Sequence, residues 1–154
     1  MAEKHLRIYL DNCCYNRPYD NQTQLRISLE SQAKIFIQNA VKLKKFELAS
    51  SFVLQYENSK NPYSNRKNNI SNFISQNTAL FVNVEKVNEV AALAKEIMCS
   101  GVKETDAAHI ACAILAACDY FLTTDDRVLK YRDDRIKIIN PVDFVKILEA
   151  NNYV

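Results

Sequence analysis

The sequence lacks the long apolar segment that a membrane-spanning helix needs, because no run approaches the roughly 20 apolar residues required to cross a bilayer. Residues 1–7 also lack the apolar centre of a signal peptide. From these absences we expect neither a membrane-spanning helix nor a signal peptide. We therefore expect no membrane contact and a cytoplasmic location.

Paired cysteines are also missing. The five cysteines are an odd number and include no Cys-x-x-Cys pair, which argues against a disulfide framework and against a thiolate zinc site. His109 and Cys112 lie three positions apart, as some zinc ligands do, but no second pair would complete such a site. We expect the cysteines to be small core residues or free thiols.

A strong charge of one sign is absent as well. The net charge of +2 is too small to indicate a nucleic-acid-binding protein by itself. Hydrophobic residues make up 48% and charged residues 25%, with no low-complexity run, which is typical of a folded soluble protein. A chain of 154 residues is long enough for one domain with a core and too short for two ordinary ones. We predict a single domain over residues 1–154.

Strands and helices are predicted to alternate along the chain. Apolar runs predict strands at residues 5–10, 46–49, 80–84, 120–123 and 136–139. Helical spacing and capping residues predict helices at residues 22–45, 51–59, 66–75, 85–99 and 106–117, and one beginning near 141. The polar segment 12–21 is predicted to be a loop. This order predicts a three-layer α/β/α sandwich with a mainly parallel central sheet of about five strands.

The long helix at 22–45 shows the clearest periodicity. Its apolar positions follow the three-to-four spacing of one helical face, which predicts that these residues face the core: Leu25, Leu29, Ala33, Phe36, Ile37, Ala40 and Leu43.

Two acidic residues stand at predicted strand ends. Asp11 and Asp125 each follow the apolar part of a predicted parallel strand, where ligand sites of open α/β sheets gather. Acids are also common in ordinary turns, so neither position is decisive alone.

Two further acids lie on inward helix faces. Asp106 shares a face with Ile110, and Glu57 lies on nearly the same side of its helix as Leu54. A charged carboxylate on such a face is costly unless it is paired or bound to a cation. A helix cap is the alternative for Asp106, because a first-turn acid also gains from the helix dipole.

The four acids could meet at one edge of the sheet, where they would repel one another unless a divalent cation neutralised them. Hard oxygen ligands without a thiolate pair or a histidine cluster favour Mg²⁺ or Mn²⁺ over zinc. Such an ion can activate water and screen the charge on phosphate oxygens, which is the chemistry of nucleases that cut RNA or DNA. We therefore predict these catalytic residues and metal ligands: Asp11, Glu57, Asp106 and Asp125.

Four ordered motifs resemble those of PIN-domain ribonucleases, over residues 8–148. They are Tyr9-Leu-Asp-Asn-Cys-Cys-Tyr-Asn16, Ser51-Phe-Val-Leu-Gln-Tyr-Glu57, Asp106-Ala-Ala-His-Ile-Ala-Cys-Ala113 and Phe121-Leu-Thr-Thr-Asp-Asp-Arg127. The resemblance implies a PIN-like fold and endoribonuclease activity. It also implies that the four acids bind one or two Mg²⁺ or Mn²⁺ ions, with Asn16 and Thr123 as polar supports.

The resemblance also bears on partners. Many small bacterial members of this family are toxins neutralised by an antitoxin, and the family often forms homodimers. RNA, an antitoxin protein and a second copy of the chain are therefore candidate partners. Two features depart from the family pattern, because Asn12 follows the first aspartate where many members carry Ser or Thr, and the polar loop through Tyr19 is longer.

Several neighbouring residues have two interpretations. Asp126 is a further metal ligand or the cap of a short helix at 127–131, and we favour the cap. Asp125 is the preferred ligand because Thr123-Thr-Asp125 matches the motif spacing. Arg17 and Arg127 are candidate phosphate contacts, although both are also compatible with a solvated surface.

Two other functions stay open. An aspartate-based phosphotransferase would use Asp11 as its nucleophile, although a haloacid-dehalogenase-like enzyme would carry Asp-x-Asp where this chain has Asp11-Asn12-Cys13. A non-catalytic PIN-like scaffold would bind RNA or a protein, and it would keep the acids as a structural metal site or a repelling cluster.

Overall fold

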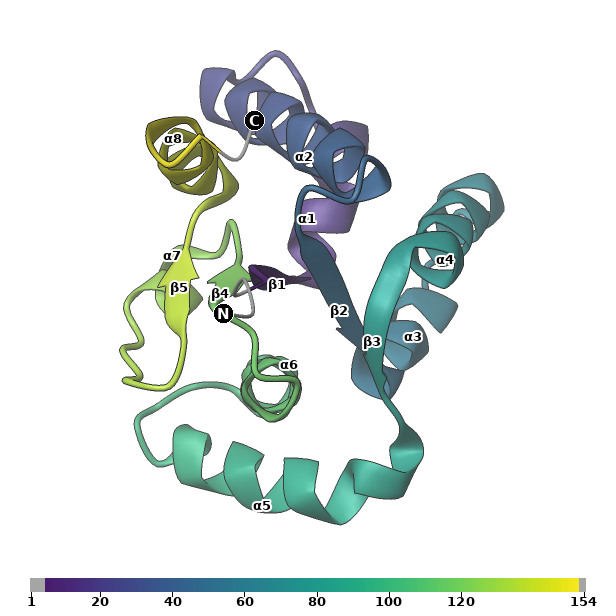
Figure 1. Ribbon diagram of the computed structural model, residues 1–154. Helices are drawn as coiled ribbons and strands as arrows, with labels where there is room; N and C mark the ends of the chain where they lie inside the picture. Colours follow the sequence, from purple (N-terminus) through teal and green to yellow (C-terminus); the bar gives the residue numbers. More distant parts are fainter. Residues whose placement is uncertain (1–4, 153–154) are drawn as a thin grey trace.

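The computed structural model describes residues 5–152, so the outermost residues covered by the single-domain prediction, 1–4 and 153–154, lie outside the described part. The described chain forms one five-stranded sheet in the order β3-β2-β1-β4-β5, and every pairing is parallel (Figure 1). The strands are β1 (Arg7–Leu10), β2 (Glu47–Ser51), β3 (Thr78–Val82), β4 (Tyr120–Leu122) and β5 (Lys137–Ile139). The predicted parallel sheet and three-layer α/β/α architecture are confirmed.

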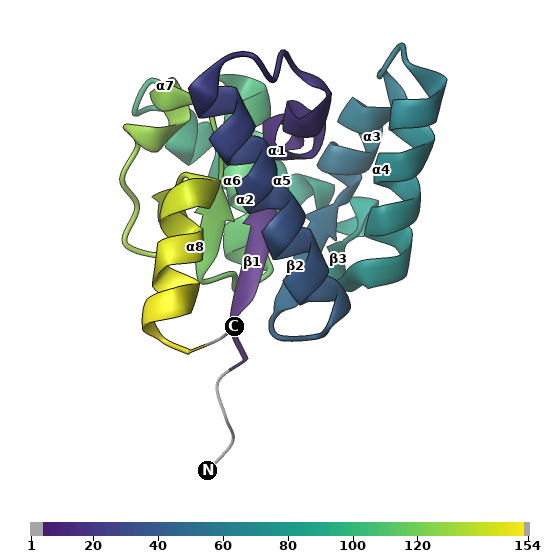
Figure 2. The same cartoon turned by 90° about the horizontal axis from the view of Figure 1, so that it is seen from above.

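Helices cover both faces of the sheet (Figures 1 and 2). One face is covered by α5 (Val87–Met98) and α6 (Glu104–Leu115). The other carries α1 (Asn12–Asn16), α2 (Leu25–Lys42) and α8 (Pro141–Ala150), while α3 (Phe52–Ser59) and α4 (Ser64–Asn77) lie at the β3 end. The short elements are the 3-10 turns η1 (Arg17–Tyr19) and η2 (Val84–Lys86), and the helix α7 (Asp126–Leu129). No helix within residues 5–152 is long and apolar enough to cross a membrane.

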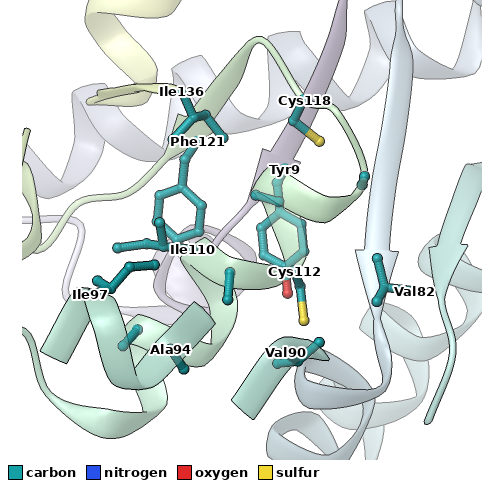
Figure 3. Close-up of a cluster of buried hydrophobic side chains, with 14 of the residues drawn as sticks. Tyr9, Val82, Val90, Ala94, Ile97, Ile110, Cys112, Cys118, Phe121 and Ile136 are labelled. Carbon is teal, nitrogen blue, oxygen red and sulfur yellow. The ribbon is translucent and has the colours of Figure 1, made fainter. Parts of the chain in front are cut away.

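Alternating side chains of the strands separate two cores, as the period of two in a β-strand requires. Tyr9 and Phe121 belong to the core under α5 and α6, where their rings stack with centroids 5.5 Å apart (Figure 3). Ile8, Leu10 and Leu122 point to the opposite core, under α2 and α8. All five cysteines are free, and three of them are buried.

The predicted loop at 12–21 is wrong, because this segment forms α1 and η1. Asp11 occupies the N-cap of α1, where its side chain accepts a hydrogen bond from the Asn12 amide. Cys14 and Tyr15 of α1 are fully buried in the core under α2, so packing stabilises a helix that its polar composition did not indicate. The chain therefore turns directly from the end of β1 into a helix.

The predicted apolar face of α2 is correct only in part. Ala33, Ile37 and Ala40 are buried, but Leu25, Leu29, Phe36 and Leu43 are exposed. The buried stripe instead begins at Glu30, whose carboxylate is 1% exposed and forms ion pairs with Arg17 and Arg26. These ion pairs let a charged residue take the inward position, which rotates the buried face of the helix.

The carboxyl ends of β1 and β4 bring distant parts of the chain together. Leu10 pairs with Leu122, and the Asp11 amide donates a hydrogen bond of 2.9 Å to the Leu122 carbonyl. Figure 2 shows α1 and α7 at this same end of the sheet. Beside them, Ser51 at the end of β2 caps α3 by accepting a hydrogen bond from the Leu54 amide.

Candidate active site

Asp11 is a buried carboxylate at the centre of this edge, with an exposed fraction of 5%. Its Oδ2 accepts a hydrogen bond of 2.9 Å from the Thr123 hydroxyl, and its Oδ1 accepts one of 2.8 Å from the Asn12 amide. Within residues 5–152, no basic side chain forms an ion pair with it. Only neutral hydrogen-bond donors among the described residues therefore stabilise this charge. A buried carboxylate without such hydrogen bonds would be very costly.

Glu57 reaches the same edge from α3, where two side chains fix it. His109 of α6 lies with its Nε2 atom 2.6 Å from Glu57 Oε2, so its N–H donates to the carboxylate. The Asn12 amide group donates a further hydrogen bond of 3.1 Å to Glu57 Oε1. Burial raises the pKa of Glu57, but the hydrogen bond and charge of His109 lower it by more, so that it lies below its ordinary value.

His109 is fully buried, and its role was not identified from the sequence. Burial lowers its pKa, but the hydrogen bond to Glu57 and the negative charge of Asp11 raise it by more, so the net shift is upward. The signal was present in the helical spacing, because His109 follows Asp106 by three residues and shares its inward face. Its spacing from Cys112 suggests only a zinc ligand, which is not the role that its contacts show.

A buried chain of hydrogen bonds extends from His109 into the core. Its Nδ1 atom lies 2.7 Å from the Tyr9 hydroxyl, which lies 2.7 Å from Ser51 Oγ. Ser51 also caps α3, the helix that carries Glu57. These hydrogen bonds therefore connect the N-cap of α3, Ser51, to Glu57 in the same helix through Tyr9 and His109. A buried network whose hydrogen bonds are all satisfied favours one arrangement of its side chains.

Asp106 lies in the first turn of α6 and differs from the other acids in having no partner. Its side chain accepts no hydrogen bond from any residue between 5 and 152. Burial raises its pKa, and the negative charges of Asp11 and Asp125 raise it further, with a smaller contribution from Glu57. The four predicted acids therefore lie close enough to share one repulsive electrostatic field.

Asp125 and Asp126 face different surroundings. Asp125 is the N-cap of α7, since its Oδ1 accepts a hydrogen bond of 2.9 Å from the Arg127 amide. The predicted cap role of Asp126 is therefore wrong, because α7 begins one residue earlier than expected. The exposed Asp126 carboxylate instead pairs with Arg26 of α2, at 2.8 Å. The charge of Asp125 is among the causes of the raised pKa of Asp106.

The predicted supporting and phosphate-binding residues lie in four different places. Thr123 contacts Asp11 directly, whereas Asn16 reaches Glu57 only through Asn12, to whose carbonyl it donates a hydrogen bond of 3.0 Å. Arg17 is held away from the acids by ion pairs with Asp20 and Glu30. Arg127 lines a small pocket beside Asp106.

The donor chemistry of the site fits a hard divalent cation. The negative charges of Asp11 and Asp125 act on Asp106, His109 offsets them only in part, and neither a thiolate pair nor a histidine pair among residues 5–152 competes with the carboxylates for a cation. No group of three or more His, Cys, Asp or Glu side chains in the described chain is close enough to form a ready-made metal-binding group. The four acids are therefore near enough to affect one another electrostatically, but they are not arranged as metal ligands. Asp11 and Glu57 form hydrogen bonds with neighbouring side chains instead.

Comparison with known proteins adds evidence on the fold. No protein-family model matches the sequence, and no curated protein sequence matches it. Solved structures do match. VapBC2 from Rickettsia felis, bound to a promoter DNA fragment, has a TM-score of 0.52 at 15% identity, covering 88% of this chain and 98% of that one. The chain has a PIN-like fold.

Two further structures support this fold. FitAcB from Neisseria gonorrhoeae has a TM-score of 0.53 at 15% identity, covering 87% of this chain and 97% of that chain. FitAB bound to an IR36 DNA fragment has a TM-score of 0.54 at 15% identity, covering 88% and 95%. The resemblance of the sequence motifs and the likeness of the structures thus agree on a PIN-like fold.

The two departures from the family pattern now have a structural description. Asn12 cannot give Asp11 a hydroxyl group, but Thr123, the residue after the neighbouring strand β4, does so. Asn12 turns its side chain to Glu57 instead. The extra polar residues before Tyr19 form α1 and η1, which pack against α2 in this PIN-like chain.

Proposed function

We propose that the chain is an endoribonuclease that uses Mg²⁺ or Mn²⁺ held by Asp11, Glu57, Asp106 and Asp125. The observation that carries the proposal is the state of Asp106, a half-buried carboxylate that has no hydrogen-bond donor among residues 5–152 and whose pKa is raised by burial and by Asp11 and Asp125. Such a cluster is costly in a folded protein unless a cation offsets it. The order of the sequence motifs within a PIN-like fold favours RNA as the substrate.

In such a site, some residues would bind the metal and others orient the metal-binding carboxylates. The bound metal would supply Lewis acidity and an activated water. Thr123 and the Asn12 amide orient Asp11, while His109 and the Asn12 side chain orient Glu57. Asp106 has both carboxylate oxygens free of hydrogen bonds from residues 5–152, so it can take a ligand without losing a partner.

Cleavage of single-stranded RNA by the purified protein tests the proposal. With Mn²⁺, the wild-type protein should cleave, and chelator should stop it. Asp106→Asn should lower the rate by at least about a hundredfold, the typical loss when one group that stabilises developing charge is removed. Asp134→Asn is the matched control, because Asp134 is exposed and lies outside the site. Equal cleavage by the Asp106→Asn protein would show that the activity arises elsewhere.

We also propose that the protein acts as the toxin of a toxin-antitoxin pair. The support is the set of matching structures, which are toxin-antitoxin assemblies containing PIN-domain toxins. Expression of the wild-type chain should stop growth, whereas Asp106→Asn should not. A small protein encoded beside it should restore growth and purify with it. Light scattering of the chain alone tests the proposed homodimer, which should show the mass of two chains.

A non-catalytic scaffold and an aspartate-based phosphotransferase give different results. A scaffold without a metal site should show no stabilisation by Mn²⁺. A phosphotransferase should yield a trapped aspartyl-phosphate at Asp11, which hydrolysis of RNA does not require.

A further inference from the structure

A small pocket of about 170 Å³ lies beside Asp106, between the start of α6 and the end of α7. Residues 100–103 line it together with Asp106, and the remaining lining residues are Arg127, Val128, Lys130 and Tyr131. Gly101 has a φ of +92° and lets the chain turn tightly here between α5 and α6. The pocket is therefore built by two segments that both lead directly to the candidate ligands.

The lining of this pocket is strongly cationic. Lys103, Arg127 and Lys130 are exposed, and none of them forms an ion pair with a residue between 5 and 152. The hydrogen bond from Arg26 is the main cause that lowers the pKa of the nearby Asp126, and the charge of Lys130 lowers it further. Asp106 is the one acid among the described residues that line the pocket, so the lining carries three positive groups and one negative group.

This state differs from that of the arginines elsewhere near the site. Arg17 and Arg26 both form ion pairs with Glu30, and each pairs with a second acid, Asp20 or Asp126 respectively. Their positive charge is therefore already offset. The pocket cations keep their charge available for a ligand. Val102 and Val128 also line the pocket. Cationic side chains beside a small apolar lining suit the phosphate and sugar of a nucleotide.

We propose that this pocket binds a phosphate of single-stranded RNA next to the phosphate that is cleaved. The inference rests on the proposed function and names the way in which the substrate is held. Four carboxylates repel a polyanion, so binding needs an attractive partner close to them. Lys103, Arg127 and Lys130 are that partner, because charge-assisted hydrogen bonds to phosphate oxygens place the neighbouring phosphate at Asp106.

A pair of triple variants tests the pocket. The first combines Lys103→Gln, Arg127→Gln and Lys130→Gln. The control combines Lys86→Gln, Lys95→Gln and Lys146→Gln, which removes the same charge from exposed positions on α5, on α8 and just before α5. Thermal unfolding should differ little among the proteins, since exposed substitutions usually change stability by less than about 0.5 kcal/mol.

Two measurements use a fluorescently labelled single-stranded RNA. Steady-state cleavage with Mn²⁺ should show the KM of the pocket variant raised about tenfold or more, with a smaller change in kcat. Fluorescence anisotropy with chelator should show weaker binding and a salt dependence whose slope falls by about 0.7 for each lost phosphate contact. The control variant should match the wild type in both.

The outcomes separate the two proposals. Wild-type cleavage with an unchanged KM and salt slope in the pocket variant would overturn the pocket and leave the nuclease standing. Binding that depends on the pocket without any cleavage would support the pocket and contradict the nuclease. A wild-type protein that neither binds nor cleaves RNA would overturn both. If the triple variant fails to fold, Lys103→Gln alone carries the same test.

Discussion

Replacing Asp106 with asparagine should stabilise the metal-free protein while abolishing its response to Mn²⁺. The folded pKa of Asp106 is raised above its unfolded value, first by burial and then by Asp11 and Asp125. A raised carboxyl pKa means that ionised Asp106 costs stability at neutral pH, and that this cost is relieved as pH falls through the folded pKa. Asparagine removes the charge and therefore the cost.

The size of the metal response follows from linkage. At a Mn²⁺ concentration a hundred times its Kd, binding stabilises the folded protein by about 2.7 kcal/mol. For a chain of this length, each kcal/mol corresponds to about 2–4 °C, so the Tm of the wild type should rise by roughly 5–11 °C. The Asp106→Asn protein should lose most of this rise.

Thermal unfolding in chelator and in Mn²⁺ measures both effects. The wild type and Asp106→Asn are compared with Asp134→Asn, whose exposed carboxylate lies outside the site. The control should resemble the wild type under both conditions. An Asp106→Asn protein that is less stable than the wild type in chelator, or that gains as much from Mn²⁺, would refute the reasoning.

Three further predictions concern the groups around the acids. Tyr9→Phe should lower the free energy of unfolding by about 1–3 kcal/mol in urea titrations, because it removes the hydrogen-bond partner of buried His109 Nδ1 and one of the partners of Ser51 Oγ; unchanged stability would contradict the buried hydrogen-bond network. In chelator, the stability contributed by the His109 pair should be lost as pH rises from about 6.5 through the raised pKa of His109. It should also be lost as pH falls from about 4.3 through the lowered pKa of Glu57, and a His109→Gln protein should lack both changes in its Tm profile. Arg17→Gln should lower the Tm without changing the KM for RNA, because its guanidinium neutralises a buried carboxylate; a raised KM at unchanged Tm would return Arg17 to substrate binding.

The parallel sheet was predictable because local patterns and topology agree. Apolar runs end at Asp11 and near Asp125, and parallel strands place such ends at one edge. The helix-face argument was also sound for Asp106, because its raised pKa reflects the partial burial that the spacing indicated. The assignment of the four acids as metal ligands stays a prediction.

Tertiary contacts decided the features that the sequence did not reveal. The polar segment after Asp11 becomes helical because Cys14 and Tyr15 reach the core. The buried face of α2 is set by Glu30, whose ion partners come from positions before and within the helix. The role of His109 could not be predicted, because it depends on a hydrogen bond to Glu57 of another helix. Spacing along the sequence does not show such a contact.

Crystals grown with Mn²⁺ give the most direct measurement of the metal centre. Anomalous scattering should show a peak within coordination distance of the Asp106 carboxylate and at least one of Asp11, Glu57 and Asp125, and the peak should vanish in Asp106→Asn crystals. Peaks found only elsewhere on the protein, or an unchanged peak in the variant, would contradict the proposed metal site.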